Sequence, residues 1–403
     1  MASSVPGGGS LHSMHRILFA TLLSVATPVL SGQKVVVRGT DQNVLPAIVD
    51  SNSPVLWRDG RFHIYTSAGT PMVSIGDSQY GPFETRQVGL DTEDHFPMWI
   101  ESVWPDEDGK VFAWYHHERI GVCPGSELTA PRIGALVSTD GGKSFRDLGI
   151  VLDSGEIVNC SAQNGYFAGG HGDFSVIPDR EGQFLYFFFG VYDGDAPSQG
   201  VAVARMAIED RFLPVGAVRK FFRGAWQESG LGGRATPIFS AQVGWEQRDT
   251  DSFWGPSLHW NTHLKSYVML LNRSCCRPGW PQEGIYISFN ANLADPVGWK
   301  DPERLLESGS WYPQVIGAGP LETEATVGRE ARLYLWGSSD LELVFLKDGE
   351  AESAEPEIPA VSIFTSSRNG SAGTPVSSRF SRRFTVRPGS VSKPLPSFEA
   401  LGK

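Results

Sequence analysis

Four residues that could perform acid–base chemistry stand at, or just before, the openings of β-rich segments. Glu101 lies within an apolar run, and Asp173 directly precedes another. Asp50 lies three residues before the opening at residue 53, and His171 lies two residues before Asp173. Buried carboxyl and imidazole groups can exchange protons near neutral pH, and two such carboxyl groups can cleave a glycosidic bond. We therefore predict Asp173, Glu101, Asp50 and His171 as catalytic residues.

Each of these residues also has a structural alternative. Asp50 begins the sequence Asp-Ser-Asn-Ser, which is strong turn composition, and a single histidine is often held by structural hydrogen bonds. Three further acids near the fourth repeat, Asp249, Asp251 and Glu283, are weaker candidates. Glu283 could simply form an ion pair with Arg277.

Aromatic residues gather near the same openings, with Trp99 among them. Flat rings suit the C–H faces of sugars, and neighbouring amide or guanidinium groups can bond sugar hydroxyls. We predict a substrate-binding set made of Trp254, Trp311, Tyr312, Gln314, Asn52 and Arg205. The alternative is packing within the fold, which must account for most of the 12 tryptophans.

A pattern that recurs five times must position these residues. Each repeat has a turn-rich opening, a β-rich segment, a polar turn and a second β-rich segment, and the openings lie near residues 53, 101, 173, 255 and 312. Turns such as Arg58-Asp59-Gly60 between β-rich runs are hairpin signals. A third β segment closes the repeats, at 72–75, 133–138, 200–206, 284–289 and 341–346.

Hairpin repeats of this size, without helical periodicity, predict an all-β chain folded as a five-bladed β-propeller. The ring of blades must close, and residues 34–38 (Lys-Val-Val-Val-Arg) are predicted to supply the outer strand of the last blade. The predicted boundaries are 1–32 for a signal peptide with its N-terminal extension, 33–349 for the propeller, and 350–403 for a Ser-, Pro- and Arg-rich disordered tail.

The N-terminus carries an export pattern. Met14, His15 and Arg16 precede an apolar stretch at 17–30, and small residues follow it. The stretch is too short for a comfortable membrane span, although a buried helix would be an alternative. We predict a secreted or periplasmic protein that no longer associates with a membrane once the signal has been removed.

The composition of the chain disfavours several classes of partner and cofactor. The net charge is −11, which disfavours nucleic acid and anionic membranes because both attract basic surfaces. The four cysteines lack the spacing of a zinc site, and Cys123–Cys160 is one disulfide that an oxidising compartment would permit. No acidic loop has the spacing of a calcium loop, so we predict no metal or cofactor.

The first, third and fourth openings resemble those of the five-bladed glycosidases, notably glycoside hydrolase family 43 and the related arabinanases, levansucrases and invertases. The resemblance spans about residues 45–345 and includes Gly-Pro-Phe at 81–83 and the segment 288–299. It implies a five-bladed propeller that acts on carbohydrate, with a calcium on the axis in some relatives. It also implies three acids at the inner ends of blades: an Asp before Pro in the first blade, an Asp opening the third, and a Glu before Gly-Pro in the fourth.

The match to these three acids is partial. Asp173 occupies the third-blade position, where the family uses an Asp to tune pKa and orientation. Ser53 stands before Pro54 in place of the general base, and Trp254 stands before Gly255-Pro256 in place of the general acid. Glu101, Asp50 and His171 are therefore substitutes chosen from their own positions.

Residues 138–145, Ser-Thr-Asp-Gly-Gly-Lys-Ser-Phe, match the Asp box known from sialidases and other propellers. Asp140 can accept hydrogen bonds from the N–H groups of a tight turn whose glycines permit positive φ. We interpret the motif as a structural hairpin. A sialidase would also need an arginine cluster in the funnel at the propeller axis, for which Arg58, Arg205 and Arg273 are candidates.

The leading hypothesis is a secreted glycoside hydrolase with paired carboxylates in the propeller funnel. The alternative is a propeller that binds a glycan or a protein without catalysis, which the non-acidic residues Ser53 and Trp254 favour. The sequence leaves open whether the chain is an enzyme, and a carboxyl pair lining the funnel would discriminate between the two.

Overall fold

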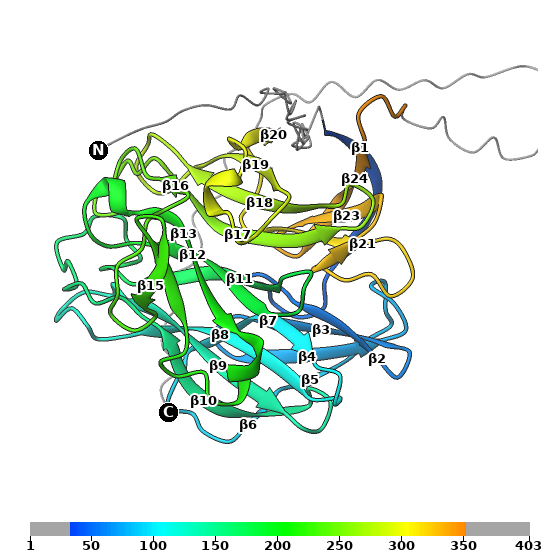
Figure 1. Cartoon of the computed structure of the whole chain (residues 1–403), viewed down its shortest axis with the longest axis horizontal. Helices are drawn as coiled ribbons and strands as arrows, with labels where there is room; N and C mark the ends of the chain where they lie inside the picture. The colour runs from blue at the N-terminus through cyan, green and yellow to red at the C-terminus, as the bar shows by residue number, and fades with distance from the viewer. Residues whose placement is uncertain (1–32, 352–403) are drawn as a thin grey trace, which may run out of the picture. The chain divides into compact units, whose positions relative to one another are not determined.

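The computed structural model describes residues 33–351. They form five sheets that follow one another in chain order as the blades of a β-propeller (Figure 1). The predicted all-β, five-bladed fold is thus confirmed. The predicted signal peptide (1–32) lies outside the described residues, as does the predicted tail (350–403) except for its first two residues.

Four or five antiparallel strands build each of the first four blades, and short strands extend three of them. The first blade contains β2 (Val55–Arg58), β3 (Arg61–Ser67), β4 (Pro71–Gly76) and β5 (Glu84–Gln87). The second contains β7 (Met98–Pro105), β8 (Val111–Arg119), β9 (Ala130–Ser138) and β10 (Ser144–Leu152), with β6 (Gly89–Leu90) beside β10. The third contains β11 (His171–Pro178), β12 (Phe184–Val191), β13 (Gly200–Ala207), β14 (Arg219–Phe222) and β15 (Ala225–Ser229), with β16 (Phe239–Ser240) beside β13. The fourth contains β17 (Ser252–Asn261), β18 (Ser266–Ser274), β19 (Gln282–Asn290) and β20 (Glu303–Glu307), with β22 (Thr326–Val327) beside β17.

Helical structure in residues 33–351 is confined to three short 3₁₀ turns, η1 (Ala196–Ser198), η2 (Ile208–Phe212) and η3 (Pro296–Gly298). None of the described helices is long and apolar enough to cross a bilayer.

The fifth blade joins the two ends of the propeller. It contains β21 (Pro313–Gly317), β23 (Glu330–Leu335), β24 (Ser338–Leu346) and, outermost, β1 (Lys34–Val44). Strand β1 runs antiparallel to β24, with Val37 opposite Leu343; in Figure 1 the dark-blue β1 lies beside the orange β24. The prediction that residues 34–38 supply the outer strand of the last blade is confirmed. The ring is closed by strand pairing between the two ends of the chain.

Each pair of neighbouring blades shares its own hydrophobic core. Five clusters lie between blades one and two, two and three, three and four, four and five, and five and one. Both faces of a blade are therefore buried, which explains why its strands are rich in aromatic and β-branched residues. A sixth cluster consists of aromatic residues, most of which lie in the loops that connect the strands: Phe167, Tyr192, Trp245, Trp254 and Trp280.

The hairpin between β9 and β10 is fixed by Asp140. Its carboxylate accepts hydrogen bonds from the backbone N–H groups of Lys143 and Ser144, both at 3.0 Å. Gly141 and Gly142 have φ values of 82° and 83°, which side chains other than glycine rarely adopt. These contacts tie Asp140 to the turn.

Candidate active site at the propeller axis

A cavity of about 100 Å³ opens where the inner ends of the blades meet. Acidic, imidazole and aromatic side chains from all five blades and their connecting loops line it: Asp50, Trp99, His116, Glu118, Tyr166, Phe167, Asp173, Trp254, Trp280, Trp311 and Tyr312. Five residues from the predicted sets lie together here, namely Asp50, Asp173, Trp254, Trp311 and Tyr312.

Irregularities at the start of the innermost strands determine which side chains point at this cavity. The pairing register shifts at Glu101 in β7, at Asp173 in β11 and around Gly255 in β17. Asp173 has φ 42° and Gly255 has φ 55°. Such bulges re-aim a side chain out of the usual alternation, and aspartate tolerates the left-handed conformation better than most residues.

Asp173 is the deepest carboxyl group of the cavity, with 5% of its surface exposed. The Tyr192 hydroxyl donates a hydrogen bond to its Oδ2. Burial, reinforced by the charge of Glu101, raises the pKa of Asp173 to about 7, even though the nearby His116 and the Tyr192 hydrogen bond lower it. Asp173 can therefore be protonated near neutral pH.

Asp50 lies in the loop before β2, and its backbone N–H donates to the carbonyl oxygen of Ser67 at 2.9 Å. Its side chain is less buried than that of Asp173. Burial and the charge of Glu118 raise the pKa of Asp50 to about 6. The cavity thus holds two carboxyl groups whose pKa values lie near neutrality and differ from each other.

His116, in β8, joins the acids of the second blade. Its Nδ1 lies 3.2 Å from Glu101 Oε1, and its Nε2 lies 3.6 Å from Glu118 Oε1. Burial alone would lower the pKa of His116, but the hydrogen bond and charge of Glu101, with Asp173 and Glu118 nearby, raise it to about 9. An imidazolium therefore stands between three acids, and its Nε2 has no hydrogen-bond partner among the described residues.

Glu101 belongs to the support of the site rather than to its wall. It is 3% exposed, and its second oxygen accepts the backbone N–H of Phe174 at 2.8 Å. Both oxygens are thus occupied by His116 and by the strand that carries Asp173. The structure therefore places this predicted catalytic residue directly behind the cavity, where it orients His116 and Asp173.

Asn52 and Gln314, predicted to bind sugar hydroxyls, make hydrogen bonds to backbone groups at the axis. Asn52 Nδ2 donates to the carbonyl oxygens of Phe174 and Pro256 at 3.0 and 3.2 Å. Gln314 Nε2 donates to Ser53 O at 2.7 Å, and its Oε1 accepts from Ser53 N. Gln314 thus joins the fifth blade to the loop before the first, whereas Asn52 joins that loop to the third and fourth blades across the axis. Neither side chain lines the cavity.

His171 and Arg205 lie away from Asp173. His171 lines a different cavity beside the third blade, because the bulge at Asp173 breaks the alternation that would otherwise put residues 171 and 173 on one face. The Arg205 guanidinium stacks over the rings of Phe184 and Trp226, at 4.2 and 4.6 Å from their centroids. The structure therefore does not bring these two residues together with the carboxyl pair.

The aromatic wall of the cavity is formed by rings that pack edge to face or at a tilt. Trp254 contacts Trp311, Tyr312 and Trp280, with ring centroids 5.6, 5.8 and 5.7 Å apart. Trp311 also stacks on the more exposed Trp336. Such rings offer flat apolar faces beside the two carboxyl groups.

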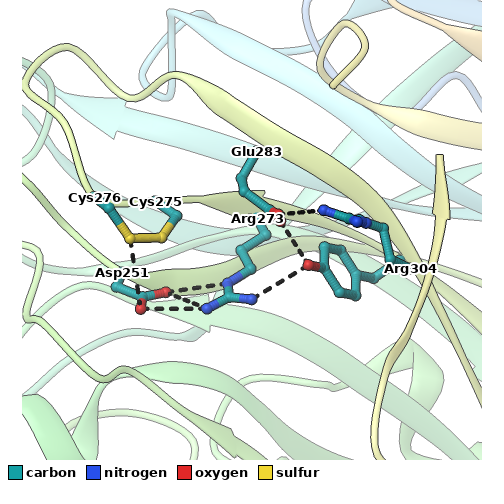
Figure 2. Close-up of a disulfide and its surroundings, with 7 residues drawn as sticks. Asp251, Arg273, Cys275, Cys276, Glu283 and Arg304 are labelled. Carbon is teal, nitrogen blue, oxygen red and sulfur yellow. Dashed lines mark hydrogen bonds and ion pairs between the residues drawn. A yellow bond between two sulfur atoms is a disulfide. The ribbon is translucent and has the colours of Figure 1, made fainter. Parts of the chain in front are cut away.

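Asp251 and Glu283 are ion-paired at the rim of the fourth blade (Figure 2). Asp251 binds the Arg273 guanidinium, and Glu283 pairs with Arg304 at 2.9 Å rather than with Arg277. Cys275 and Cys276 form a disulfide next to Asp251. The other described disulfide joins Cys123 to Cys160, the bridge that the sequence permitted.

The remaining candidates also lie outside the cavity wall. Asp249 is exposed, and none of the arginines considered for a sialidase lines the axial cavity. Arg58 instead donates to the Gly109 carbonyl oxygen, and Arg273 binds Asp251. The described residues therefore offer no arginine clamp for a carboxylate at this site.

A metal fits the axial cluster poorly. Ligand atoms of Glu101, His116 and Asp173 lie within 4.8 Å of one another. However, both Glu101 oxygens already accept hydrogen bonds, and His116 would have to lose a proton before it could bind a cation. Calcium also prefers six to eight oxygen ligands, so we assign no metal-dependent step to these residues.

Sequence reasoning missed His116, Glu118 and Tyr192. His116 and Glu118 follow an apolar run in β8 and lie two residues apart, so they share one face of the strand. That alternation was the signal that could have revealed them. Tyr192 lies in the loop after β12 and carried no comparable signal.

No protein-family model matches the sequence, and no similar sequence is found among curated proteins. Solved structures with a similar fold include the catalytic domain of a GH62 α-L-arabinofuranosidase from Coprinopsis cinerea, at 9% identity and a TM-score of 0.46 over 77% of this chain and 97% of that chain. A thermostable family-43 glycoside hydrolase matches at 13% identity and a TM-score of 0.46, over 78% of this chain and 97% of that chain. An endo-arabinase from Bacteroides thetaiotaomicron matches at 13% identity and a TM-score of 0.44, over 77% of this chain and 97% of that chain. Similarity at this level concerns the fold and says nothing of substrate.

Proposed function

We propose that this protein is a glycoside hydrolase whose catalytic carboxyl groups are Asp173 and Asp50. The observation that carries the proposal is that both line one aromatic-walled cavity and that burial raises both pKa values toward neutrality. Carboxyl groups tuned apart in this way can divide the roles of acid and base.

The division of roles follows from the two pKa values. Asp173 keeps its proton to a higher pH, so it is the general acid that protonates the leaving oxygen. Asp50 ionises first and acts as the base or nucleophile at the sugar carbon. The His116 imidazolium donates a hydrogen bond to Glu101 and limits the rise in the pKa of Asp173.

The size of the cavity favours recognition of a single sugar unit. Its volume of about 100 Å³ is well below the roughly 300–1,000 Å³ typical of drug-sized ligands. Trp254, Trp280 and Trp311 would pack against the apolar face of that unit. We therefore expect cleavage at a chain end rather than within a long polysaccharide.

The test is to assay the purified protein against a panel of aryl glycosides and oligosaccharides, including arabinofuranosides, xylosides and galactosides. Release of sugar from at least one substrate, with loss of terminal units only, is the expected result. Hydrolysis of none of them by a folded sample would oppose the proposal.

One observation favours a second candidate, a propeller that binds sugar without hydrolysing it. Ser53 and Trp254 occupy the positions where the resembled family carries its base and its acid. Under this alternative, sugars would bind in the axial cavity with no turnover. Calorimetry on the same panel distinguishes the two, because binding without product formation supports the second candidate alone.

The proposed location is outside the cytoplasm, and the export pattern that supports it lies at residues 14–32, outside the described residues. Disulfides are compatible with an oxidising compartment. N-terminal sequencing of the exported protein should find a start close to Gly32. Retention of residues 14–31 in mature protein would argue against a cleaved signal.

A further inference from the structure

The chain contains three Asn-X-Ser sequences of the kind that accept an N-linked glycan. They are Asn159-Cys160-Ser161, Asn272-Arg273-Ser274 and Asn369-Gly370-Ser371. Because a glycan is bulky and hydrophilic, a folded protein tolerates it only on an exposed asparagine. The third sequence lies outside the described residues. The structure distinguishes the first two, which look alike in the sequence.

Asn159 lies on the surface, in the loop between β10 and β11. Its side chain supports a tight turn, because Oδ1 accepts a hydrogen bond from the backbone N–H of Ser161 at 3.0 Å. The Asn159 carbonyl oxygen accepts from the backbone N–H of Ala162, also at 3.0 Å. Asparagine favours such turns. The Nδ2 atom, to which a glycan would be attached, has no hydrogen-bond partner among the described residues. A sugar on Nδ2 therefore breaks none of these contacts.

The loop around Asn159 is anchored and leaves room for a sugar. A disulfide joins Cys160 to Cys123, and the backbone N–H of Asn159 donates to the carbonyl oxygen of Ala168 at 2.6 Å. Asn159 and Ile157 line a cavity of about 250 Å³, and Ile157 is 91% exposed. The first sugar of a glycan would remove part of this apolar side chain from water. None of the residues lining this cavity lines the axial cavity.

Asn272 has the opposite environment. It lies in β18 and is 0% exposed. Its Nδ2 donates to the carbonyl oxygens of Trp254 and Gly255, at 3.3 and 3.4 Å. Its Oδ1 accepts from Gln282 Nε2 at 2.9 Å and from the backbone N–H of Tyr312 at 3.2 Å. A glycan on this Nδ2 would have to displace the core packed around β18, so a folded chain cannot carry one.

We propose that Asn159 is an N-glycosylation site of the exported protein and that Asn272 is not modified in it. The Asn159 Nδ2 atom forms a bond to C1 of the N-acetylglucosamine of a lipid-linked oligosaccharide. The bond from C1 to the lipid pyrophosphate breaks, the pyrophosphate leaves with the electron pair, and the amide loses one proton. The proposal rests on the proposed export of the chain, through a secretory pathway that supplies this donor.

Mapping of glycans on protein from a yeast secretion host tests the proposal. The full chain is expressed in two forms, one with its own N-terminus and one with a host signal sequence placed before Met1. Enzymatic release of N-glycans in heavy-oxygen water converts each glycosylated asparagine to labelled aspartate, which peptide mass spectrometry locates. The medium and the cell membranes are both analysed, so that poor secretion does not hide the result. Secreted protein should be labelled at Asn159 and unlabelled at Asn272.

Variants of Ser161 test whether the label depends on the Asn-X-Ser sequence. Ser161→Ala should abolish the label at Asn159, whereas Ser161→Thr should retain it. Both variants keep Cys160 and its disulfide. Ser126→Ala is the matched control, because Ser126 is also an exposed loop serine but belongs to no Asn-X-Ser sequence. It should leave the label unchanged.

The outcomes separate this site from the proposed export. The glycosylation site is overturned if Asn159 stays unlabelled in the form with the host signal, if Ser161→Ala keeps the label, or if secreted, folded protein is labelled at Asn272. Label at Asn159 in the form with the host signal, together with an unlabelled, intracellular chain in the other form, would support the site and contradict the export signal.

Discussion

Burial raises the pKa of both Asp173 and Asp50, but the two carboxyl groups are buried to different extents. For Asp173 nearly complete burial dominates and brings the pKa to about 7. For Asp50 partial burial and the charge of Glu118 bring it to about 6. Between these two values Asp50 is mostly ionised while Asp173 is mostly protonated, which is the state that acid–base hydrolysis needs.

This difference predicts a bell-shaped pH dependence of kcat/KM. The rate should fall below about pH 6 as Asp50 gains a proton, and above about pH 7 as Asp173 loses one. Initial rates on an active aryl glycoside, measured across this range at constant ionic strength, check it. A rate that stays level from pH 5 to pH 8 would contradict the assignment.

His116 should control the alkaline side of that profile. Its positive charge lowers the pKa of Asp173, so His116→Gln should move the alkaline limb to higher pH and lower kcat about tenfold or more. The glutamine can still donate to Glu101, which should preserve the fold.

His263→Gln is the matched control, because His263 contacts Glu350 and does not line the axial cavity. The His263→Gln variant should leave both the acidic and the alkaline limb of the pH dependence of kcat/KM unchanged. An alkaline limb that does not move in His116→Gln would show that His116 does not act on Asp173.

At the level of elements, the bulges at the starts of β7, β11 and β17 decide which residues reach the axis. Regular alternation would put His171 and Asp173 on one face, and the sequence alone predicts that they act together. The bulge separates them into two cavities. A one-residue irregularity of this kind leaves little trace in hydrophobic patterning, which is why His171 was grouped with Asp173.

Strand β1 is the element that closes the ring. Val37 pairs with Leu343 and packs against the core between blades four and five. Val37→Asp would bury a carboxylate there and should lower the free energy of unfolding by about 2 kcal/mol. Urea unfolding followed by tryptophan fluorescence measures the loss.

The neighbouring Val36 provides the control. It alternates to the other face of β1 and does not belong to that core cluster. Val36→Asp should therefore cost clearly less. Equal losses in the two variants would contradict the packing assigned to β1.

For the whole molecule, the sequence predicted the architecture better than the site. Five hairpin repeats specified five blades, and the apolar run at 34–38 specified the closing strand, because both depend on local patterns. The axial cavity depends instead on where five distant strands start. Asp50, Trp254, Trp311 and Tyr312 could be placed near it. Asn52 and Gln314 instead bind backbone groups of other blades, which no local pattern reveals.

The most direct test of the carboxyl pair is to measure the hydrolytic rate of two variants, Asp173→Asn and Asp50→Asn, beside the wild type. Glu209→Gln is the control, because Glu209 is an exposed carboxylate outside the cavity. Asparagine tolerates the positive φ at residue 173 and can still accept from Tyr192, so the fold should persist. Each active-site variant should lower kcat/KM about 100-fold or more, and Glu209→Gln should match wild type. Near-native turnover in both active-site variants would show that the catalytic carboxyl groups are not at the propeller axis.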